Sequence, residues 1–415
     1  MATRNKSILV CRLCQKNNLK NIFDFGLIPL GNNLQSDKDN SLNIEKYPLS
    51  INQCMDCNHF QLNFSVDPEL LYATNYTYLT GVGKSFCNHL EQFALDVLKY
   101  FSSEVKKYKI KVVDIGSNDG TALSFFAKLG CDVLGVDPAK TPSAIANKNG
   151  ISTINKFFSL SLAKQLTKEN KTFDIVVSHN VLAHIEDIND IFQGIYEILK
   201  INGMFVFEVG YFGDIILKNI YDTVYHEHLD YHSKNPLVNF LLKKGFSIKK
   251  IESNEIQGGS LRFYCIKEKV PKIFSNVTKQ LSIEKDIFNN KNINIWIENI
   301  FKNIQSIKLN INEALLEGKK VWGYGAPTKA TLIANMLGDI VNSIEFIIDD
   351  NPLKESKYIP GTSIPIIMKS KMPVYKNQLI ICFAWNFFDD IYSKLKLENI
   401  NGTLLNIQNG EKLEL

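Results

Sequence analysis

Apolar and polar positions along the middle of the chain alternate in a way that predicts a layered α/β domain. Short apolar runs that end in polar or glycine residues are typical of buried parallel strands. Such runs occupy residues 112–115, 133–136, 173–177, 204–209 and 260–265, and helical spacing occupies 84–101 and 188–200. Strands that alternate with helices pack as a doubly wound parallel sheet. We expect this α/β architecture over residues 76–270.

The same alternation restarts near the C-terminus. Residues 271–315 have helical spacing, strands are expected at 320–324, 344–348 and 379–383, and a helix at 328–337. A second, smaller Rossmann-like α/β domain is therefore expected over 271–415. Residues 1–75 hold only short apolar runs between turn residues such as Gly26, Pro29 and Gly31. They predict a small, loop-rich module that is stabilised by something other than a core.

Length and composition limit the class of protein. A chain of 415 residues with 45% apolar and 22% charged positions has room for two or three domains and is typical of globular proteins. The net charge of +4 gives too weak a field to predict nucleic-acid binding. Because the sequence shows neither a membrane-spanning run nor a signal-peptide core, we expect a cytoplasmic protein that binds no membrane. The sequence does not fix the oligomeric state.

Two cysteine pairs lie near the N-terminus, and the other four cysteines are scattered. Cys11 with Cys14 and Cys54 with Cys57 each have the spacing C-x2-C. Two such turns can bring four thiolates into the tetrahedron that Zn²⁺ prefers, and a closed four-sulfur shell leaves no position for a substrate. We expect a structural zinc ion. Unliganded core cysteines are the alternative, and His59 is either a spare ligand or an ordinary surface histidine.

A glycine loop, Asp114-Ile115-Gly116-Ser117-Asn118-Asp119-Gly120, follows the first strand of the central domain. Glycines let the backbone approach a cofactor at a helix N-terminus, and the spacing D-x-G-x-x-x-G is the form that S-adenosylmethionine-dependent methyltransferases use. Asp137 ends the next strand, where a carboxylate can bind both ribose hydroxyls. A turn that serves packing alone would not require this acid. We expect S-adenosylmethionine to bind at Asp114, Gly116, Asn118, Gly120, Asp137 and Asn180.

Three of the seven histidines lie in the segment Tyr225-His226-Glu227-His228-Leu229-Asp230-Tyr231-His232. Histidine exchanges protons near neutral pH, and a carboxylate such as Glu227 can orient an imidazole. The segment therefore predicts an acid–base site. A satisfied buried network, a second metal site at His226 and His228, and a surface loop are the alternatives.

A second glycine turn, Gly323-Tyr324-Gly325-Ala326-Pro327-Thr328-Lys329, joins a strand to a helix in the last domain. Its backbone amides and Lys329 could hold a diphosphate. A helix-capping turn with a solvated lysine is the alternative. Asp349 and Asp350 close the following strand, and a strand-end turn explains them better than a catalytic pair.

Taken in order along the whole chain, these motifs resemble those of the sugar C-methyltransferases, which add a methyl group to a nucleotide-linked keto-deoxy sugar. The shared motifs are the paired C-x2-C module, residues 114–120, 180–184, 225–228, 258–262, 324–326 with Lys329, and 360–365. The resemblance implies a zinc-binding domain over 1–75, an S-adenosylmethionine domain over 76–270, and a Rossmann-like domain over 271–415 that helps to hold the sugar nucleotide. The sequence departs from the family at Gly210 and Ala330.

The resemblance also implies roles for individual residues. Tyr225 and His228 are expected at the reacting sugar, with His228 as the base, Glu227 beside them and Tyr76 as a further active-site tyrosine. Substrate-binding roles are expected for Lys329, Tyr324, His184 and Arg262. His228 would remove the C3 hydrogen beside a 4-keto group, and the enolate would take the methyl group. An O- or N-methyltransferase acting on a nucleotide sugar or small metabolite, and a binding protein without chemistry, are the alternatives.

Overall fold

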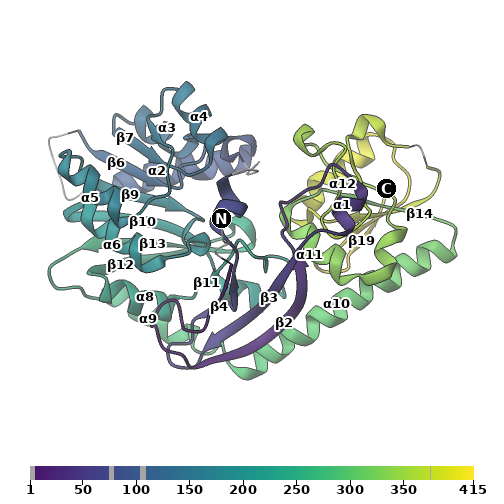
Figure 1. The fold of residues 1–415 in the computed structure, drawn as a ribbon, viewed down its shortest axis with the longest axis horizontal. Helices are drawn as coiled ribbons and strands as arrows, with labels where there is room; N and C mark the ends of the chain where they lie inside the picture. Colours follow the sequence, from purple (N-terminus) through teal and green to yellow (C-terminus); the bar gives the residue numbers. More distant parts are fainter. Residues whose placement is uncertain (1–4, 74–78, 103–108, 374) are drawn as a thin grey trace.

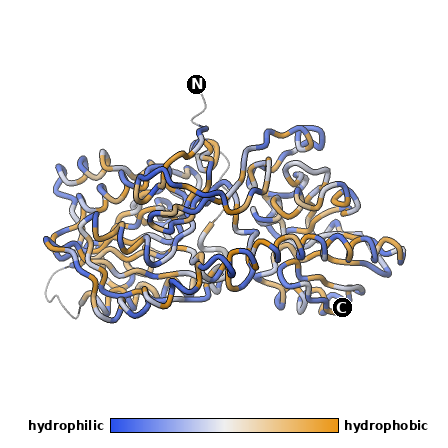
Figure 2. The backbone as a smooth tube through the Cα atoms, turned by 90° about the horizontal axis from the view of Figure 1, so that it is seen from below, coloured by the Kyte–Doolittle hydropathy of each residue, from blue (hydrophilic) through white to orange (hydrophobic). Residues whose placement is uncertain are grey.

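The structure is a computed structural model that describes residues 5–73, 79–102, 109–373 and 375–415. Figure 1 shows two lobes joined by the helix α10 (Asn290–Leu316) and by the long strands β2 (Leu19–Pro29) and β3 (Lys46–Cys54). A helix of 27 residues is about 40 Å long, so α10 reaches from one lobe to the other. In Figure 2, hydrophobic and hydrophilic positions alternate along this helix, which presents a buried stripe from Ile293 to Ala314.

The central lobe is built on a seven-stranded sheet with the order β12-β13-β10-β9-β6-β7-β8. Its strands are β6 (Lys111–Ile115), β7 (Asp132–Val136), β8 (Thr153–Ile154), β9 (Phe173–His179), β10 (Leu199–Gly210), β12 (Phe246–Asn254) and β13 (Ser260–Lys267). The predicted strands are confirmed, and β6 to β10 are parallel. The expectation of a wholly parallel sheet is wrong at β13, which runs antiparallel to β10 and β12. The connection from Asn254 to Ser260 is too short for a parallel crossover.

Helices cover both faces of this sheet. They are α2 (Lys84–Ser102), α3 (Thr121–Lys128), α4 (Lys140–Lys148), α5 (Leu160–Lys168), α6 (Ile188–Ile198), α8 (Lys234–Lys243) and α9 (Ser275–Glu284), whereas α7 (Phe212–Leu217) packs against α10. One face packs against α2 and α3, and the other packs against α5, α6 and α8. The doubly wound architecture expected from the sequence is therefore present, with the glycine loop between β6 and α3.

The N-terminal residues form a four-stranded antiparallel sheet instead of the expected loop-rich module. Its order is β11-β4-β3-β2, with β4 (Phe60–Leu62) and with β11 (Asp230–Tyr231) supplied by the central domain. Gly26, with a φ of 80°, lies in one of two register shifts between β2 and β3. A bulged strand therefore contains Gly26 and Pro29, whereas Gly31 lies in the turn that follows it. Phe25, Leu49 and Ile51 share a buried cluster with α10 and the C-terminal domain, so this sheet does have a core.

Short elements complete the N-terminal part. The strand β1 (Lys6–Ser7) pairs with β5 (Phe64–Ser65), and the helix α1 (Lys38–Leu42) lies beside the C-terminal lobe in Figure 1. The hydroxyl of Ser41 donates to the carbonyl of Ile359 at 2.9 Å, and the amide of Gly361 donates to the carbonyl of Ser41 at 2.9 Å. The N-terminal residues thus contact both lobes.

The C-terminal lobe contains a six-stranded sheet with the order β16-β15-β14-β17-β18-β19. The strands are β14 (Lys320–Tyr324), β15 (Ile347–Ile348), β16 (Ile366–Ile367), β17 (Gln378–Cys382), β18 (Thr403–Asn406) and β19 (Lys412–Glu414), and α11 (Thr328–Met336) and α12 (Phe388–Leu397) pack with them. Only β19 runs antiparallel to its neighbour. The carboxyl ends of β14 and β17 form the switch point of this Rossmann-like sheet. Across the described ranges, no helix combines the length and apolar character needed to cross a bilayer.

Candidate functional site

The four paired cysteines converge on one point of the N-terminal domain. The sulfur atoms of Cys11, Cys14, Cys54 and Cys57 all lie within 4.8 Å of one another, with distances of 3.5 Å from Cys11 to Cys57 and from Cys14 to Cys54. A tetrahedral site with Zn–S bonds of about 2.3 Å separates its sulfurs by about 3.8 Å, so the cluster fits the ion. His59 is not part of this cluster, and the expectation of a surface histidine is wrong: its side chain is completely buried, with Nε2 2.8 Å from Oδ1 of Asp230. The protein thus has a four-cysteine zinc site.

The glycine loop of the central domain has the geometry of a cofactor cradle. Gly116 and Gly120 have left-handed φ angles of 77° and 78° on either side of the turn into α3. The carboxylate of Asp137 fixes the loop by accepting from the amides of Asn118 at 2.9 Å and Ala139 at 2.8 Å. The loop therefore has a fixed backbone at the carboxyl edge of the sheet, the edge at which such folds bind S-adenosylmethionine.

Buried polar atoms beside this loop support the same assignment. Oδ1 of Asp114 and the hydroxyl of Ser117 are buried and have no hydrogen-bond partner within the described part of the chain. Burial, together with the charge of Asp137, raises the pKa of Asp114 to about 8. Asn180 follows β9 with a φ of 54°, and its amide donates to the carbonyl of Glu208 at 2.9 Å. A polar ligand that reached Oδ1 of Asp114 would satisfy it, whereas the Ser117 hydroxyl packs beside Gly135.

Gly116→Ala tests the cradle. A Cβ atom at this position would lie 2.3 Å from Cγ2 of Val181, and an L-residue in this backbone conformation is strained by about 1 to 3 kcal/mol. We expect S-adenosylhomocysteine, the demethylated cofactor, to bind at least about tenfold more weakly, since 1.4 kcal/mol corresponds to a factor of ten; calorimetry measures this. Gly130→Ala is the matched control because its φ of 88° is also left-handed but nothing lies within 4 Å of the added Cβ. Equal affinities of the two variants would contradict the prediction.

His228 and Tyr225 face each other at the start of the segment rich in histidine. The Tyr225 hydroxyl lies 3.0 Å from Nε2 of His228, and Nδ1 of His228 lies 2.8 Å from the carbonyl oxygen of Thr223. A carbonyl only accepts, so this network assigns the proton to Nδ1 and leaves a lone pair on Nε2. Burial lowers the pKa of His228 to about 4. His228 is therefore neutral at pH 7 and able to accept a proton.

His184 packs beside this pair. Its ring centroid lies 4.8 Å from that of His228, and burial lowers its pKa to about 3. The hydroxyl of Tyr72 lies 3.1 Å from Nδ1 of His184 and donates to the carbonyl of Glu227 at 3.0 Å. Tyr76, the tyrosine singled out in the sequence, lies outside the described residues. Tyr72 has no sequence signal of its own, because a single tyrosine outside a recognisable motif resembles many others.

Glu227 is fully enclosed and bonded to the N-terminal domain. Nδ2 of Asn32 donates to Oε1 of Glu227 at 2.7 Å, and the Thr328 hydroxyl donates to Oδ1 of Asn32 at 2.8 Å. Burial raises the pKa of Glu227 to about 7, against the hydrogen bond from Asn32. Because Thr328 begins α11, this chain of hydrogen bonds joins all three domains at the site.

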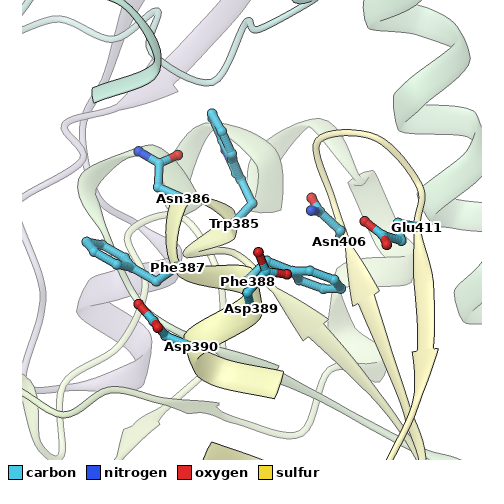
Figure 3. A pocket seen from close by; sticks show the side chains of 8 residues that line it. All are labelled: Trp385, Asn386, Phe387, Phe388, Asp389, Asp390, Asn406 and Glu411. Carbon is cyan, nitrogen blue, oxygen red and sulfur yellow. The ribbon is translucent and has the colours of Figure 1, made fainter. Parts of the chain in front are cut away.

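Lys329 follows Thr328 and points back to the central domain. Its ammonium group lies 3.3 Å from Oδ2 of Asp222, donates to Oδ1 of Asn386 at 3.0 Å, and lies 3.9 Å from the ring centroid of Trp385. Trp385 and Asn386 also border a cavity of ≈ 300 Å³ at the carboxyl ends of β17 and β18, as Figure 3 shows. Lys329 thus lies near the switch point of the C-terminal sheet and contacts Asp222, which precedes His228 by six residues in the central domain.

The other two residues expected to bind substrate lie in different places. Nε of Arg262 donates to Glu208 at 2.8 Å, and its Nη1 donates to Asp96 at 3.2 Å, inside the central domain. His89 lies 2.8 Å from the same Glu208, and despite burial these neighbours lower the pKa of Glu208 to about 2. Tyr324 directs its hydroxyl toward Asp350 at 3.3 Å. The roles of Arg262 and Tyr324 in substrate binding stay predictions.

His226 predicts a pH dependence of stability. Nε2 lies 3.3 Å from the carbonyl of Tyr47, Nδ1 has no partner among the described residues, and burial lowers the pKa to about 4. A histidine in the unfolded chain has a pKa of about 6.5. The contribution of neutral His226 to the free energy of unfolding is therefore complete above pH 6.5 and is lost as the pH falls toward 4. The loss at pH 5 is about 2 kcal/mol.

We expect His226→Gln to remove this part of the pH dependence. Denaturant titrations of the wild type and the variant between pH 7.5 and 5 measure it, and the comparison of slopes cancels any constant cost of the substitution. Parallel loss of stability in both proteins would show that His226 does not titrate on unfolding.

Comparisons with known proteins agree with these sites. Family profiles match residues 11–72 ("Putative zinc binding domain"), 86–251 ("Methyltransferase domain") and 255–406 ("C-methyltransferase C-terminal domain"). The chain is 26% identical over 400 residues to C-methyltransferase NovU of Streptomyces niveus, which covers 94% of this chain and 93% of that protein. It is 24% identical over 135 residues to a ubiquinone biosynthesis O-methyltransferase of Bartonella tribocorum, covering 32% of this chain and 52% of that protein.

A solved structure, magnesium protoporphyrin IX methyltransferase from Synechocystis with bound SAH, is 17% identical to this chain. The match covers 46% of this chain and 90% of that chain, with a TM-score of 0.36.

The three family profiles together identify the family. They follow one another along the chain in the same order as the four-cysteine site, the glycine loop and the last Rossmann-like sheet. This chain belongs to the S-adenosylmethionine-dependent C-methyltransferases that join a zinc-binding domain, a methyltransferase domain and a C-terminal domain.

Proposed function

We propose that this enzyme methylates carbon C3 of a nucleotide-linked 4-keto-deoxy sugar. The observation that carries the proposal is the lone pair on Nε2 of His228, which the bond from Nδ1 to Thr223 assigns. A carbon nucleophile must be made by removing a proton, whereas an oxygen or nitrogen nucleophile needs less help from a base. The resemblance of the motifs to sugar C-methyltransferases supplies the substrate class.

His228 is the base in this proposal. The hydrogen beside a ketone is more than about ten pKa units less acidic than imidazolium, which corresponds to a barrier of roughly 14 kcal/mol. A pKa near 4 keeps His228 neutral but makes it a weak base. Most of the barrier must therefore be lowered by groups that stabilise the enolate oxygen as its charge develops.

Tyr225 and Glu227 are the groups that we assign to this task. The Tyr225 hydroxyl already lies within hydrogen-bond distance of Nε2 of His228, so a ketone oxygen bound beside the imidazole would lie near the same phenol. Glu227, with a pKa of about 7, is partly protonated at neutral pH and can donate a proton. S-adenosylmethionine, held by the glycine loop and Asp137, supplies the methyl group as an electrophile.

The C-terminal domain holds the nucleotide in this proposal. The amides at the start of α11 and the ammonium of Lys329 favour a diphosphate, although Asp222 already neutralises part of the Lys329 charge. Thr328 and Asn32 connect this end of the substrate to Glu227. A substrate with a sugar at one end and a nucleotide at the other would therefore span the two lobes.

Mass spectrometry of the reaction tests the proposal. The enzyme is incubated with S-adenosylmethionine and with dTDP-, GDP-, UDP- or CDP-linked 4-keto-6-deoxy sugars, and each product is examined for one added methyl group. We expect a gain on one nucleotide sugar, with loss of a deuterium label from C3. A methyl group on oxygen or nitrogen, with the C3 label retained, would contradict the proposal and favour the O- or N-methyltransferase alternative.

A further inference from the structure

Arg12 lies inside the first cysteine turn, between Cys11 and Cys14, but its side chain leaves the metal site. The side chain is only 8% exposed, and the backbone amide of Arg12 donates to Oε1 of Gln61 at 2.8 Å. The residue is therefore anchored at its main chain by the N-terminal sheet. Its guanidinium group reaches into the central domain.

Three acceptors of the central domain share this guanidinium group. Nε donates to Oδ1 of Asp230 at 2.9 Å, Nη1 donates to the carbonyl of Glu186 at 3.0 Å, and Nη2 donates to the carbonyl of Ile185. Nε2 of His59 lies 2.8 Å from the same oxygen of Asp230. Burial would raise the pKa of Asp230, but Arg12 and then His59 hold it well below its usual value. Asp230 is therefore a buried carboxylate that depends on Arg12.

The two loops held by Arg12 are those that carry His184, which is expected to bind substrate, and His228, which is expected to act as the base. Ile185 and Glu186 follow His184 directly, and Asp230 comes two residues after His228. The rings of His184 and His228 lie 4.8 Å apart. One planar group thus bridges both loops.

We propose that Arg12 is a positioning residue, which transmits the geometry of the zinc-bound cysteine turn to His184 and His228. The proposal rests on the proposed function for the roles of the two histidines. It assigns the zinc-binding domain a part in aligning the base, beyond holding its own sheet together.

The chemistry of arginine is required here because the contacts need a rigid fork. A guanidinium group offers five N–H donors in one plane, whereas a lysine ammonium group is a point charge on a flexible stem. Arg12→Lys keeps the charge that Asp230 requires but cannot reach three acceptors in fixed directions. Arg12→Lys therefore separates the alignment of the two loops from the neutralisation of the Asp230 charge.

The test compares three proteins with the wild type: Arg12→Lys, the double variant Arg12→Met with Asp230→Asn, and Lys16→Met as the control. The double variant removes both buried charges together, which avoids an unpaired carboxylate. Lys16 is two residues beyond Cys14, and its side chain is 62% exposed in an ion pair with Asp56. Native mass spectrometry measures the zinc content of each protein.

The readout that needs no substrate is the Nδ1–H resonance of His228 in protein labelled with ¹⁵N-histidine. This proton is held by the carbonyl of Thr223, so we expect a protected signal in the wild type and in Lys16→Met. In both Arg12 variants the signal should shift or be lost to exchange, although zinc content and S-adenosylhomocysteine affinity are unchanged. If a substrate is in hand, kcat should fall roughly ten- to a hundredfold with little change in KM.

An unchanged His228 signal in zinc-loaded Arg12→Lys and in the double variant would overturn the proposal. Loss of zinc from both variants would also overturn it, because Arg12 would then serve the metal site itself. Failure to methylate any sugar would count against the proposed function only, since the histidine signal is measured without substrate.

Discussion

His228→Asn is expected to stop both methyl transfer and the exchange of the substrate's C3 hydrogen with solvent. Asparagine keeps a polar side chain at the site, but its amide cannot accept the proton that Nε2 of His228 takes in the proposed reaction. A well-placed general base contributes about 10²- to 10⁴-fold to the rate, and we expect kcat to fall by that order. Deuterium uptake at C3, followed by NMR with S-adenosylhomocysteine in place of the methyl donor, isolates proton removal from transfer.

His226→Asn is the matched control for this experiment at neutral pH. Its side chain belongs to the same segment, but its Nε2 lies 3.3 Å from the carbonyl of Tyr47 in the N-terminal domain. It should retain both exchange and turnover. Deuterium uptake that persists in His228→Asn would exclude His228 as the base. The carboxylate of Glu227 would then be the next candidate base to test.

Removal of zinc is expected to unfold the N-terminal sheet. Structural zinc contributes about 10 to 16 kcal/mol in small zinc-binding domains, which matches or exceeds the total stability of a typical domain, about 5 to 15 kcal/mol. Cys54 ends β3 and is completely buried in the core that also contains Leu13 and Val113. We expect Cys54→Ser, or a chelator, to raise hydrogen exchange strongly over residues 46–62 and 229–232, as measured by mass spectrometry.

Cys87→Ser gives the matched control for zinc removal. Its thiol lies on α2, 3.5 Å from the carbonyl of Gly81, and is not part of the four-cysteine cluster. Its exchange pattern should equal that of the wild type. If Cys54→Ser lost turnover but kept the protection of residues 46–62, the ion would have a catalytic role instead.

The central fold was predictable because its apolar runs are local signals. The strands β6, β7, β9 and β10 end beside glycine or polar residues that the sequence already marks, such as Gly116 or Asp137, whereas β8 and β12 were not expected. The N-terminal sheet was missed for the opposite reason: its hairpin contains Gly26 inside a bulge, and its fourth strand, β11, lies far along the chain. Periodicity in one segment cannot report a partner that distant.

The residues of the candidate site also fall into those that local sequence predicts and those that it does not. The cysteines, the glycine loop and Tyr225 with His228 form recognisable spacings, and the structure brings the members of each group together. Asn32, Tyr72 and Arg12 were not found, because each is one polar residue whose partner comes from another domain. Their significance depends on long-range packing, which no local spacing records.

Strand β11 has a consequence for the order in which the protein can fold during synthesis. Its residues Asp230 and Tyr231 pair with Gln61 and Phe60 of β4, so the N-terminal sheet lacks its edge strand until they leave the ribosome. At about 5 to 20 residues per second, the first strands wait roughly ten to thirty seconds for that partner. An early zinc ion would keep the two cysteine turns together during this interval and shield an otherwise open strand edge from association with other nascent chains.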